Sequence, residues 1–375
     1  MYDGLRDIVH AMYELALATR KRFYLARCYH LTMTTYYMSL DFRSAVIYGQ
    51  KALDAYEGSP SEAQAPWNIR GSINTRYFLS SCYLGLNDFE SAWEVIAGIN
   101  HAEPFGATSY ARAMASWCRM AGEHAEAIRW NEHIIAESEK DGDDDEVCKR
   151  RAIACADAVR DFRFEEAALI ENPDRLYCGF DAELSVGYYA ALGTAYRLGG
   201  EGDASDRAFA SARYHLEQAR TDIERAQSTA NLAWALLLAG ERKEARETAL
   251  AALAAANRCR HYAAAFSAEL ILAELAFQDS SREEFAFFLR DAAILAGAAI
   301  YRERAAMARF WFLAWLLVDS GDEDEGIGRV FKWEAADQYL AEARRLMQAE
   351  LEALPDDRAR ERCLSLSVYG RILTA

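Results

Sequence analysis

Apolar residues recur along this chain at intervals of three and four, in segments that end at short polar or glycine-containing turns. This is the pattern of amphipathic helices, and its return at a nearly fixed period is typical of stacked helix pairs. We therefore expect an all-α fold, a right-handed α-solenoid of about eight antiparallel helix pairs. The pattern predicts a capping helix within 1–20, repeats over 21–351 with an insertion at 321–330, and a capping helix within 355–375. Because no Gly/Ser/Pro-rich linker divides the chain, we expect 1–375 to be a single domain.

Apolar periodicity and turn residues together give the limits of each pair. The expected pairs are 22–38 with 42–56, 67–85 with 89–100, 107–121 with 124–140, 147–159 with 164–171, 182–198 with 204–219, 223–239 with 243–257, 262–277 with 282–295, and 305–319 with 333–351. The fourth pair matches the pattern least well, since Asn172, Pro173 and Asp174 end its second helix early.

A small residue near the start of each second helix sets the period. These residues are Ala45, Ala92, Ala127, Ala167, Ser205, Ala245 and Ala336, with Glu284 or Ala286 in the remaining place. Most successive residues lie close to 40 positions apart, the length of one helix pair. Five residues before the small residue, the turn needs a left-handed backbone, which Gly and Asn adopt most easily. Asn87, Gly122, Gly200 and Gly240 satisfy this requirement, whereas Leu40 and Phe162 are expected exceptions.

The best single copy of the repeat contains Leu192, Gly193, Tyr196 and Gly200, followed by Ser205. This spacing resembles the tetratricopeptide family, and weaker copies extend the resemblance over 22–346. The first-helix Trp and the closing Pro of that family are mostly absent, and the period exceeds its 34 residues. The chain is therefore more similar to the long, degenerate repeats of bacterial regulatory proteins. This resemblance implies a scaffold that binds a protein or peptide.

The charge balance excludes one class of partner. The chain has 58 Asp and Glu against 42 Lys and Arg, for a net charge of −16, and nucleic-acid binding needs a basic surface. The strongest apolar run, 310–318, is about half of what a membrane span requires. Eight cysteines without a C-x-x-C motif are typical of a reducing compartment. We expect a cytoplasmic protein with neither nucleic acid nor membrane as a partner.

Three patterns in the sequence partly match known ligand-binding motifs, but each is incomplete. Residues 326–331 begin like a dinucleotide-binding loop, but the third glycine is missing and a helix precedes them. Asp141, Asp143 and Asp145 alternate as in a calcium loop, although Glu146 occupies the position of its glycine. His124 and His133 are too far apart on one helix to share a metal. We therefore expect no cofactor, no metal and no enzymatic activity.

The resemblance implies that the first helix of each pair lines a concave groove. The groove residues it implies as candidates for ligand binding are Arg27, Asn74, Tyr77, Arg112, Arg119, Lys149, Arg160, Arg197, Asn231, Trp234, Trp311 and Trp315. Half of them are basic in an acidic chain, which suits an acidic or extended peptide held by charge-assisted hydrogen bonds and aromatic packing.

Two alternatives to a basic peptide-binding groove remain open. The basic residues could pair with acids on neighbouring helices instead of binding a ligand. The solenoid could also enclose a small molecule or sugar stacked on Trp234, Trp311 and Trp315, and act as a sensor that signals to a partner protein. Asn231 favours a peptide, since the resemblance implies that an Asn there binds the backbone of the ligand.

Overall fold

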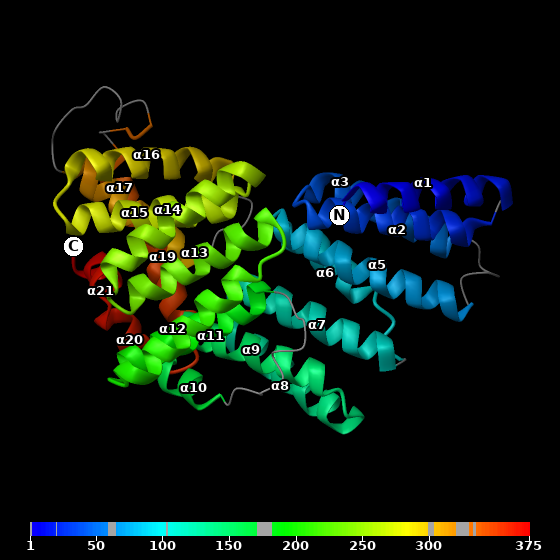
Figure 1. Ribbon diagram of the computed structural model, residues 1–375, viewed down its shortest axis with the longest axis horizontal. Helices are drawn as coiled ribbons and strands as arrows, with labels where there is room; N and C mark the ends of the chain where they lie inside the picture. Colours follow the sequence, from blue (N-terminus) through cyan, green and yellow to red (C-terminus); the bar gives the residue numbers. More distant parts are fainter. Residues whose placement is uncertain are drawn as a thin grey trace. The chain divides into compact units, whose positions relative to one another are not determined.

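The computed structural model describes residues 2–19, 21–58, 65–102, 104–170, 182–298, 304–319, 330–332 and 335–375. Within these ranges all regular structure is helical, and nineteen helices are present (Figure 1). The chain forms two compact units, Met1–Ile134 (unit 1) and Ile135–Ala375 (unit 2). The expectation of a single continuous domain stays a prediction. The expected insertion at 321–330, with most of the dinucleotide-like pattern, lies outside the described residues except for Val330.

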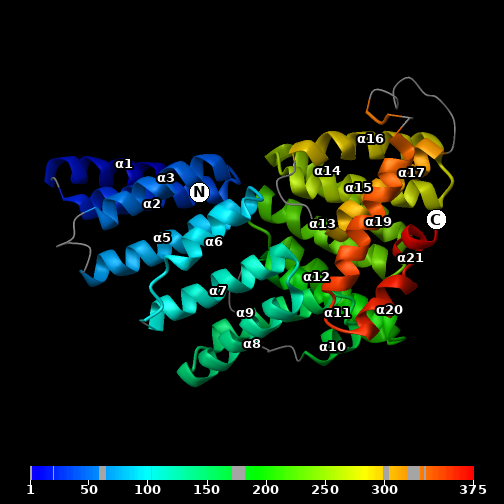
Figure 2. The ribbon, with the colours of Figure 1, turned by 180° about the vertical axis from the view of Figure 1, so that it is seen from behind.

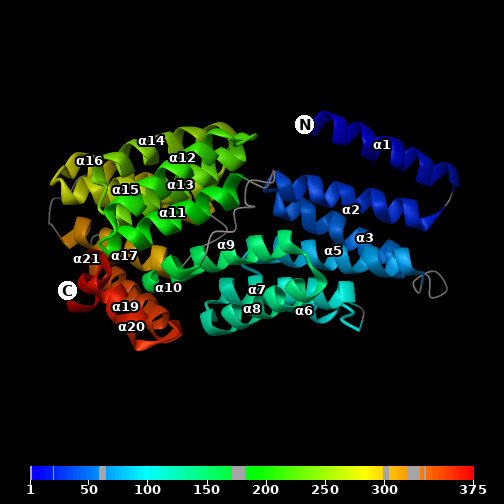
Figure 3. The same cartoon turned by 60° about the horizontal axis from the view of Figure 1, so that its bottom comes forward.

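Unit 1 begins with α1 (Tyr2–Thr19), which packs on α2, and continues with three pairs. The pairs are α2 (Arg22–Met38) with α3 (Phe42–Glu57), α5 (Pro66–Gly85) with α6 (Phe89–Ala97), and α7 (Pro104–Ala121) with α8 (His124–Asp141), whose last residues belong to unit 2. The first helices pack in chain order, α2 on α5 and α5 on α7 (Figure 3). The first three expected pairs are thus confirmed, and a helix precedes them.

Unit 2 contains five further pairs. They are α9 (Asp144–Arg160) with α10 (Phe164–Leu169), α11 (Ala182–Leu198) with α12 (Gly202–Glu217), α13 (Asp222–Leu238) with α14 (Arg242–Cys259), α15 (Tyr262–Gln278) with α16 (Arg282–Ala298), and α17 (Arg304–Asp319) with α19 (Ala336–Ala353). The first helices α9, α11, α13, α15 and α17 each pack on the next, so every pair buries its apolar face on its neighbours. The all-α fold of stacked helix pairs is confirmed.

The turn within each of the first seven pairs, all of which the structure describes, passes through a residue with positive φ. Glycine or asparagine supplies it at four of these turns, as the sequence predicts. Leu40 (φ 60°) and Phe162 (φ 59°) were expected to break the rule, but they adopt the same left-handed backbone. A non-glycine residue pays about 1–2 kcal/mol for this conformation. The packing of the two flanking helices therefore decides the turn even where the residue does not favour it.

The same geometry fixes the register of the seventh pair, α15 with α16. Ser280 has φ 59°, and five residues later the Phe285 amide donates to the Ser281 carbonyl at 2.9 Å. Ala245 makes the equivalent bond to Glu241 in the preceding pair. The expectation of Glu284 or Ala286 at this place is wrong, because the residue is the buried Phe285. Neither a glycine in the turn nor a small residue after it marks this repeat in the sequence.

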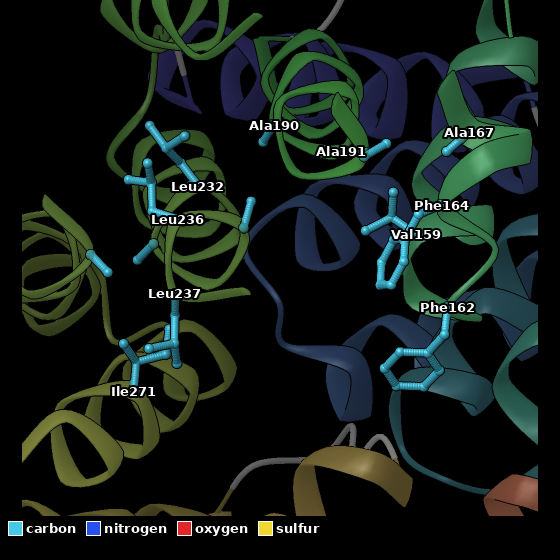
Figure 4. Close-up of a cluster of buried hydrophobic side chains, with 14 of the residues drawn as sticks. Val159, Phe162, Phe164, Ala167, Ala190, Ala191, Leu232, Leu236, Leu237 and Ile271 are labelled. Atoms are coloured by element: carbon cyan, nitrogen blue, oxygen red, sulfur yellow. The ribbon is translucent and has the colours of Figure 1, made fainter. Parts of the chain in front are cut away.

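The largest buried cluster lies in unit 2 and is shared by all its pairs (Figure 4). Val159 and Phe164 contribute from the first pair of the unit, Leu232 and Leu236 from α13, and Ile271 from α15. These side chains come from helices more than a hundred residues apart in sequence. This cluster therefore links successive pairs of the unit, as nearest-neighbour stacking of repeats requires, and two smaller clusters lie beside it in the same unit.

The C-terminal segment differs from the single capping helix predicted for 355–375. It forms two short helices, α20 (Asp357–Ser365) and α21 (Ser367–Thr374), and α21 packs on α17 and α19 (Figure 2). The Glu165 carboxylate of α10 pairs with Arg358 of α20 at 3.0 Å, and the Phe162 and Tyr369 rings lie 5.5 Å apart. The last helices of the chain thus join the first and the last pairs of unit 2.

Candidate binding faces

The first helices of unit 1 are free of acidic residues. In α2, α5 and α7 together there is no Asp or Glu, although 58 of the 375 residues of the chain are acidic. These helices carry six arginines, namely Arg22, Arg27, Arg70, Arg76, Arg112 and Arg119. Every first helix of unit 2 contains at least one acid. The first helices of unit 1 therefore carry a concentration of positive charge that the composition of the whole chain does not suggest.

Three of these arginines have structural roles near the helix ends. Arg76 forms an ion pair with Glu57 at 2.9 Å, and Arg22 donates to the Gly58 carbonyl at 2.6 Å. Arg70 lies over the Phe105 ring at 5.8 Å. The other three, Arg27, Arg112 and Arg119, occupy the predicted ligand-facing positions and are half-buried.

Aromatic side chains connect the first two of these helices. Phe78 of α5 lies against three rings, Tyr37 at 5.6 Å, Tyr77 at 5.4 Å and His30 at 5.9 Å. Tyr37, Tyr77 and Phe78 are each half-buried, as is the neighbouring Asn74. We define the unit 1 face as Arg27, His30, Tyr37, Asn74, Tyr77, Phe78, Arg112 and Arg119. Its combination of rings and guanidinium groups suits a ligand that has both apolar and acidic side chains.

His30 is held rigidly between α2 and α5. Its Nδ1 lies 2.9 Å from the Thr75 hydroxyl oxygen, which in turn donates to the Gly71 carbonyl at 2.7 Å. A hydroxyl has one proton, so Thr75 accepts the second bond and His30 Nδ1 donates it. Burial, with a smaller effect of the nearby Arg27 charge, lowers the pKa of His30 to about 4. The imidazole is therefore neutral at pH 7, with its proton on Nδ1.

Two of the predicted basic residues of unit 2 form ion pairs with acids of the chain. Arg160 pairs with Asp157 of its own helix at 2.6 Å. Arg197 pairs with Asp206 at 2.6 Å and with Glu241 at 2.8 Å, both at the starts of second helices. At these two positions the structure favours the alternative in which the bases pair with acids. Lys149 is half-buried on α9.

The tryptophans of unit 2 also have partners within the chain. Trp311 stacks on Tyr339 of α19 at 5.3 Å and 16°, and Trp315 lies 5.4 Å from Phe312. The Arg309 guanidinium covers the Trp234 ring at 4.0 Å from its centroid. Each tryptophan is half-buried, so a ligand would have to share these rings with the protein's own side chains.

Asn231 lies one turn before Trp234 on α13, and its side-chain oxygen accepts a hydrogen bond from Gln227 at 2.9 Å. This bond orients the amide, because the Oδ1 atom points back along the helix towards Gln227. The predicted neighbours Asn231 and Trp234 do lie on one helix face.

The sequence analysis missed a buried charged pair beside Trp234. Glu274 of α15 and Arg309 of α17 are 3.4 Å apart and almost completely buried. Burial raises the pKa of Glu274, and the Arg309 charge lowers it in part. Glu274 stands eleven residues before Phe285, as Trp234 stands eleven before Ala245. A period of 40 residues counted from Ala245 leads to Phe285, and the position eleven residues before Phe285 is Glu274.

The described residues contain neither a metal-binding cluster nor a membrane-spanning helix. No group of three or more His, Cys, Asp or Glu in these ranges could hold a metal ion. Within the same ranges, no helix has the length and apolar character needed to cross a membrane.

Comparison with known proteins assigns this chain to no family. No family model matches the sequence, and no curated protein matches it. Among solved structures, the crystal structure of the APC/C hetero-tetramer Cut9-Hcn1 is 10% identical, with a TM-score of 0.30 and coverage of 100% of this chain and 87% of that one. A circular tandem repeat protein with novel repeat topology and enhanced subunit contact surfaces is 15% identical, with a TM-score of 0.21 and coverage of 100% and 88%. At these TM-scores the likeness carries no argument.

The class of the protein follows from its own helix pairs. The helix pairs pack in chain order within each unit, and the seven described turns within pairs pass through a left-handed residue, so the chain is a helical-repeat protein of the α-solenoid class. Membership of the tetratricopeptide family stays a prediction that rests on the spacing around Leu192 and Gly193.

Proposed function

We propose that this chain is a non-enzymatic binding scaffold whose unit 1 holds an acidic, extended segment of a partner protein. The segment lies across α2, α5 and α7 on the unit 1 face, where arginines pair with its carboxylates and the rings around Phe78 contact its apolar side chains. Such a protein acts by holding a partner and needs neither a cofactor nor a metal.

One observation carries the proposal, the absence of acids from the three first helices of unit 1. In a chain with a net charge of −16, these helices together carry six arginines and no Asp or Glu. Opposite charge on a partner would speed association and fix its register. In unit 2, by contrast, every first helix contains at least one Asp or Glu. We therefore assign the ligand to unit 1.

The test uses a panel of short fluorescein-labelled peptides that alternate Asp or Glu with Phe or Leu, and counterparts with Asn or Gln in place of the acids. Fluorescence anisotropy with the full chain should show binding of acidic peptides only, weakening as salt rises. Replacing Arg112 and Arg119 together by Ala should weaken binding by about tenfold and flatten the salt dependence.

Arg242→Ala with Arg246→Ala is the matched control. It also removes two arginines from one helix, but these pair with Asp279 on the surface of unit 2. If both double variants bind alike, or if the neutral peptides bind as well as the acidic ones, the assignment to unit 1 is wrong.

The sensor alternative predicts a different result in the same system. A small molecule or sugar stacked on Trp234 would quench its fluorescence and leave the Arg112 and Arg119 double variant unaffected.

A further inference from the structure

The Nε2 atom of His30, on the unit 1 face, has no hydrogen-bond partner in the described residues. His30 is only 7% exposed, and Nδ1 is its hydrogen-bonding atom in the protein. Nε2 makes no hydrogen bond there, yet it is not among the fully buried unpartnered atoms, so it keeps access to the surface. A buried histidine with one ring nitrogen that makes no hydrogen bond is unusual, since buried polar atoms nearly always have a hydrogen-bond partner.

The chemistry of that nitrogen is fixed by its surroundings. The Thr75 hydroxyl accepts a hydrogen bond from Nδ1–H, so Nε2 carries a lone pair and can itself accept a hydrogen bond. The low pKa of His30 keeps it an acceptor throughout the physiological range. The centroids of the His30 and Phe78 rings lie 5.9 Å apart, and the Arg27 side chain is close enough to affect the His30 titration.

We infer that His30 Nε2 accepts a hydrogen bond from a backbone N–H of the bound segment, and that Arg27 binds an acidic side chain of the segment next to this N–H. This inference rests on the proposed function and names the residue that fixes the register of the segment. An acceptor for a main-chain N–H beside a cation for a carboxylate fits the backbone of an acidic residue, or of the residue next to it. The guanidinium alone would bind any carboxylate, whereas the histidine requires an N–H at a set distance from it.

The variant His30→Asn isolates the role of Nε2. An asparagine amide nitrogen takes the place of Nδ1 and can still donate to Thr75, while nothing replaces Nε2. Circular dichroism and thermal unfolding establish that the variant is folded. The probe is the tightest-binding acidic peptide of the panel, remade with one amide at a time replaced by an ester, which removes a single N–H.

With the wild-type chain, one ester position should weaken binding by about three- to tenfold, the effect of one hydrogen bond. With His30→Asn, the parent peptide should bind that much more weakly, and the same ester should cause no further loss. If the ester lowers affinity equally in both proteins, His30 is not the partner of that N–H and the inference fails while the proposed function stands.

Two further results keep the inference open to refutation. Nitrogen NMR of the free wild-type chain should show the Nδ1–H tautomer for His30, and a proton on Nε2 would overturn the inference even if His30→Asn does not fold. If no acidic peptide binds the wild-type chain, the proposed function is wrong and the inference is lost with it. The variant Thr75→Val releases the tautomer and should weaken the parent peptide without touching any surface atom of the unit 1 face.

Discussion

At the scale of single residues, the helical stack tolerates several buried polar side chains. Glu269 on α15 is 4% exposed, and its Oε2 atom has no hydrogen-bond partner within the described ranges. Burial, and to a smaller extent the nearby Asp291, raises the pKa of Glu269 from 4.5 to about 8. At neutral pH this carboxyl is therefore protonated in the folded chain and ionised in the unfolded chain.

This difference predicts how stability depends on pH. Between pH 4.5 and 8 the folded state binds a proton that the unfolded state has lost, so the Glu269 contribution to stability falls as pH rises through this window. The slope from this group is at most about 1.4 kcal/mol per pH unit. In Glu269→Gln this slope should vanish, which urea unfolding at pH 5, 7 and 9 measures.

Glu283→Gln, an exposed acid on the adjoining helix α16, is the control for Glu269→Gln. Equal pH slopes for the wild type and Glu269→Gln would show that Glu269 ionises normally in the folded chain.

At the scale of elements, each pair depends on close approach of its two helices. Gly193 of α11 faces Phe209 of α12, and the Gly193 carbonyl accepts from the Ser205 hydroxyl at 2.8 Å. A Cβ at position 193 would lie 2.8 Å from the Phe209 ring, closer than side chains tolerate. The glycine identified in the sequence as part of the best repeat is thus at a helix crossing.

Gly193→Leu should overpack this crossing and lower the free energy of unfolding by about 1–3 kcal/mol. Gly187→Ala on the same helix is the control, since a Cβ there meets nothing within 4 Å. That variant should be neutral or slightly stabilising, because alanine favours helix over glycine. Thermal and urea unfolding compare the two. A Gly193→Leu melt that coincides with the parent would refute this register of α11.

At the scale of the whole molecule, unit 2 is closed by its own C-terminus. Tyr369 of α21 is 3% exposed and contacts Phe162 near the start of the unit, while α21 packs on α17 near its end. The ion pair of Glu165 with Arg358 lies at the surface and adds little. Burial of Tyr369, Cys363 and Ile372 in the core of the unit therefore contributes more to this closure than the ion pair does.

Tyr369→Ala should destabilise unit 2 by about 3 kcal/mol, because it leaves a cavity against Phe162. Hydrogen exchange should then speed up at 162–169 as well as in α20 and α21, some two hundred residues away in sequence. Leu364→Ala, whose side chain is 39% exposed, should leave exchange unchanged. If only α21 itself exchanges faster in Tyr369→Ala, the C-terminus does not stabilise the first pair of the unit.

The sequence by itself determined the helix pairs and most of their limits. Apolar periodicity and the turn glycines are local signals, and the packing they imply at Gly193 agrees with the contact to Phe209. Where the local signal was absent, prediction failed. Ser280 and Phe285 carry neither a turn glycine nor a small residue, so the seventh pair was misplaced and Glu274 was missed.

Only the tertiary structure decided which candidate residues already have partners. Arg197 and Arg119 are equivalent in the repeat pattern, since each lies eight residues before the small residue of its pair. Arg197 forms ion pairs with Asp206 and Glu241, whereas Arg119 lies on α7, which like α2 and α5 contains no acid. The closure of unit 2 by α20 and α21 was equally hidden, because it joins segments about two hundred residues apart. Periodicity reports which face of a helix is buried, whereas the partner of a charged side chain depends on which helices the fold brings beside it.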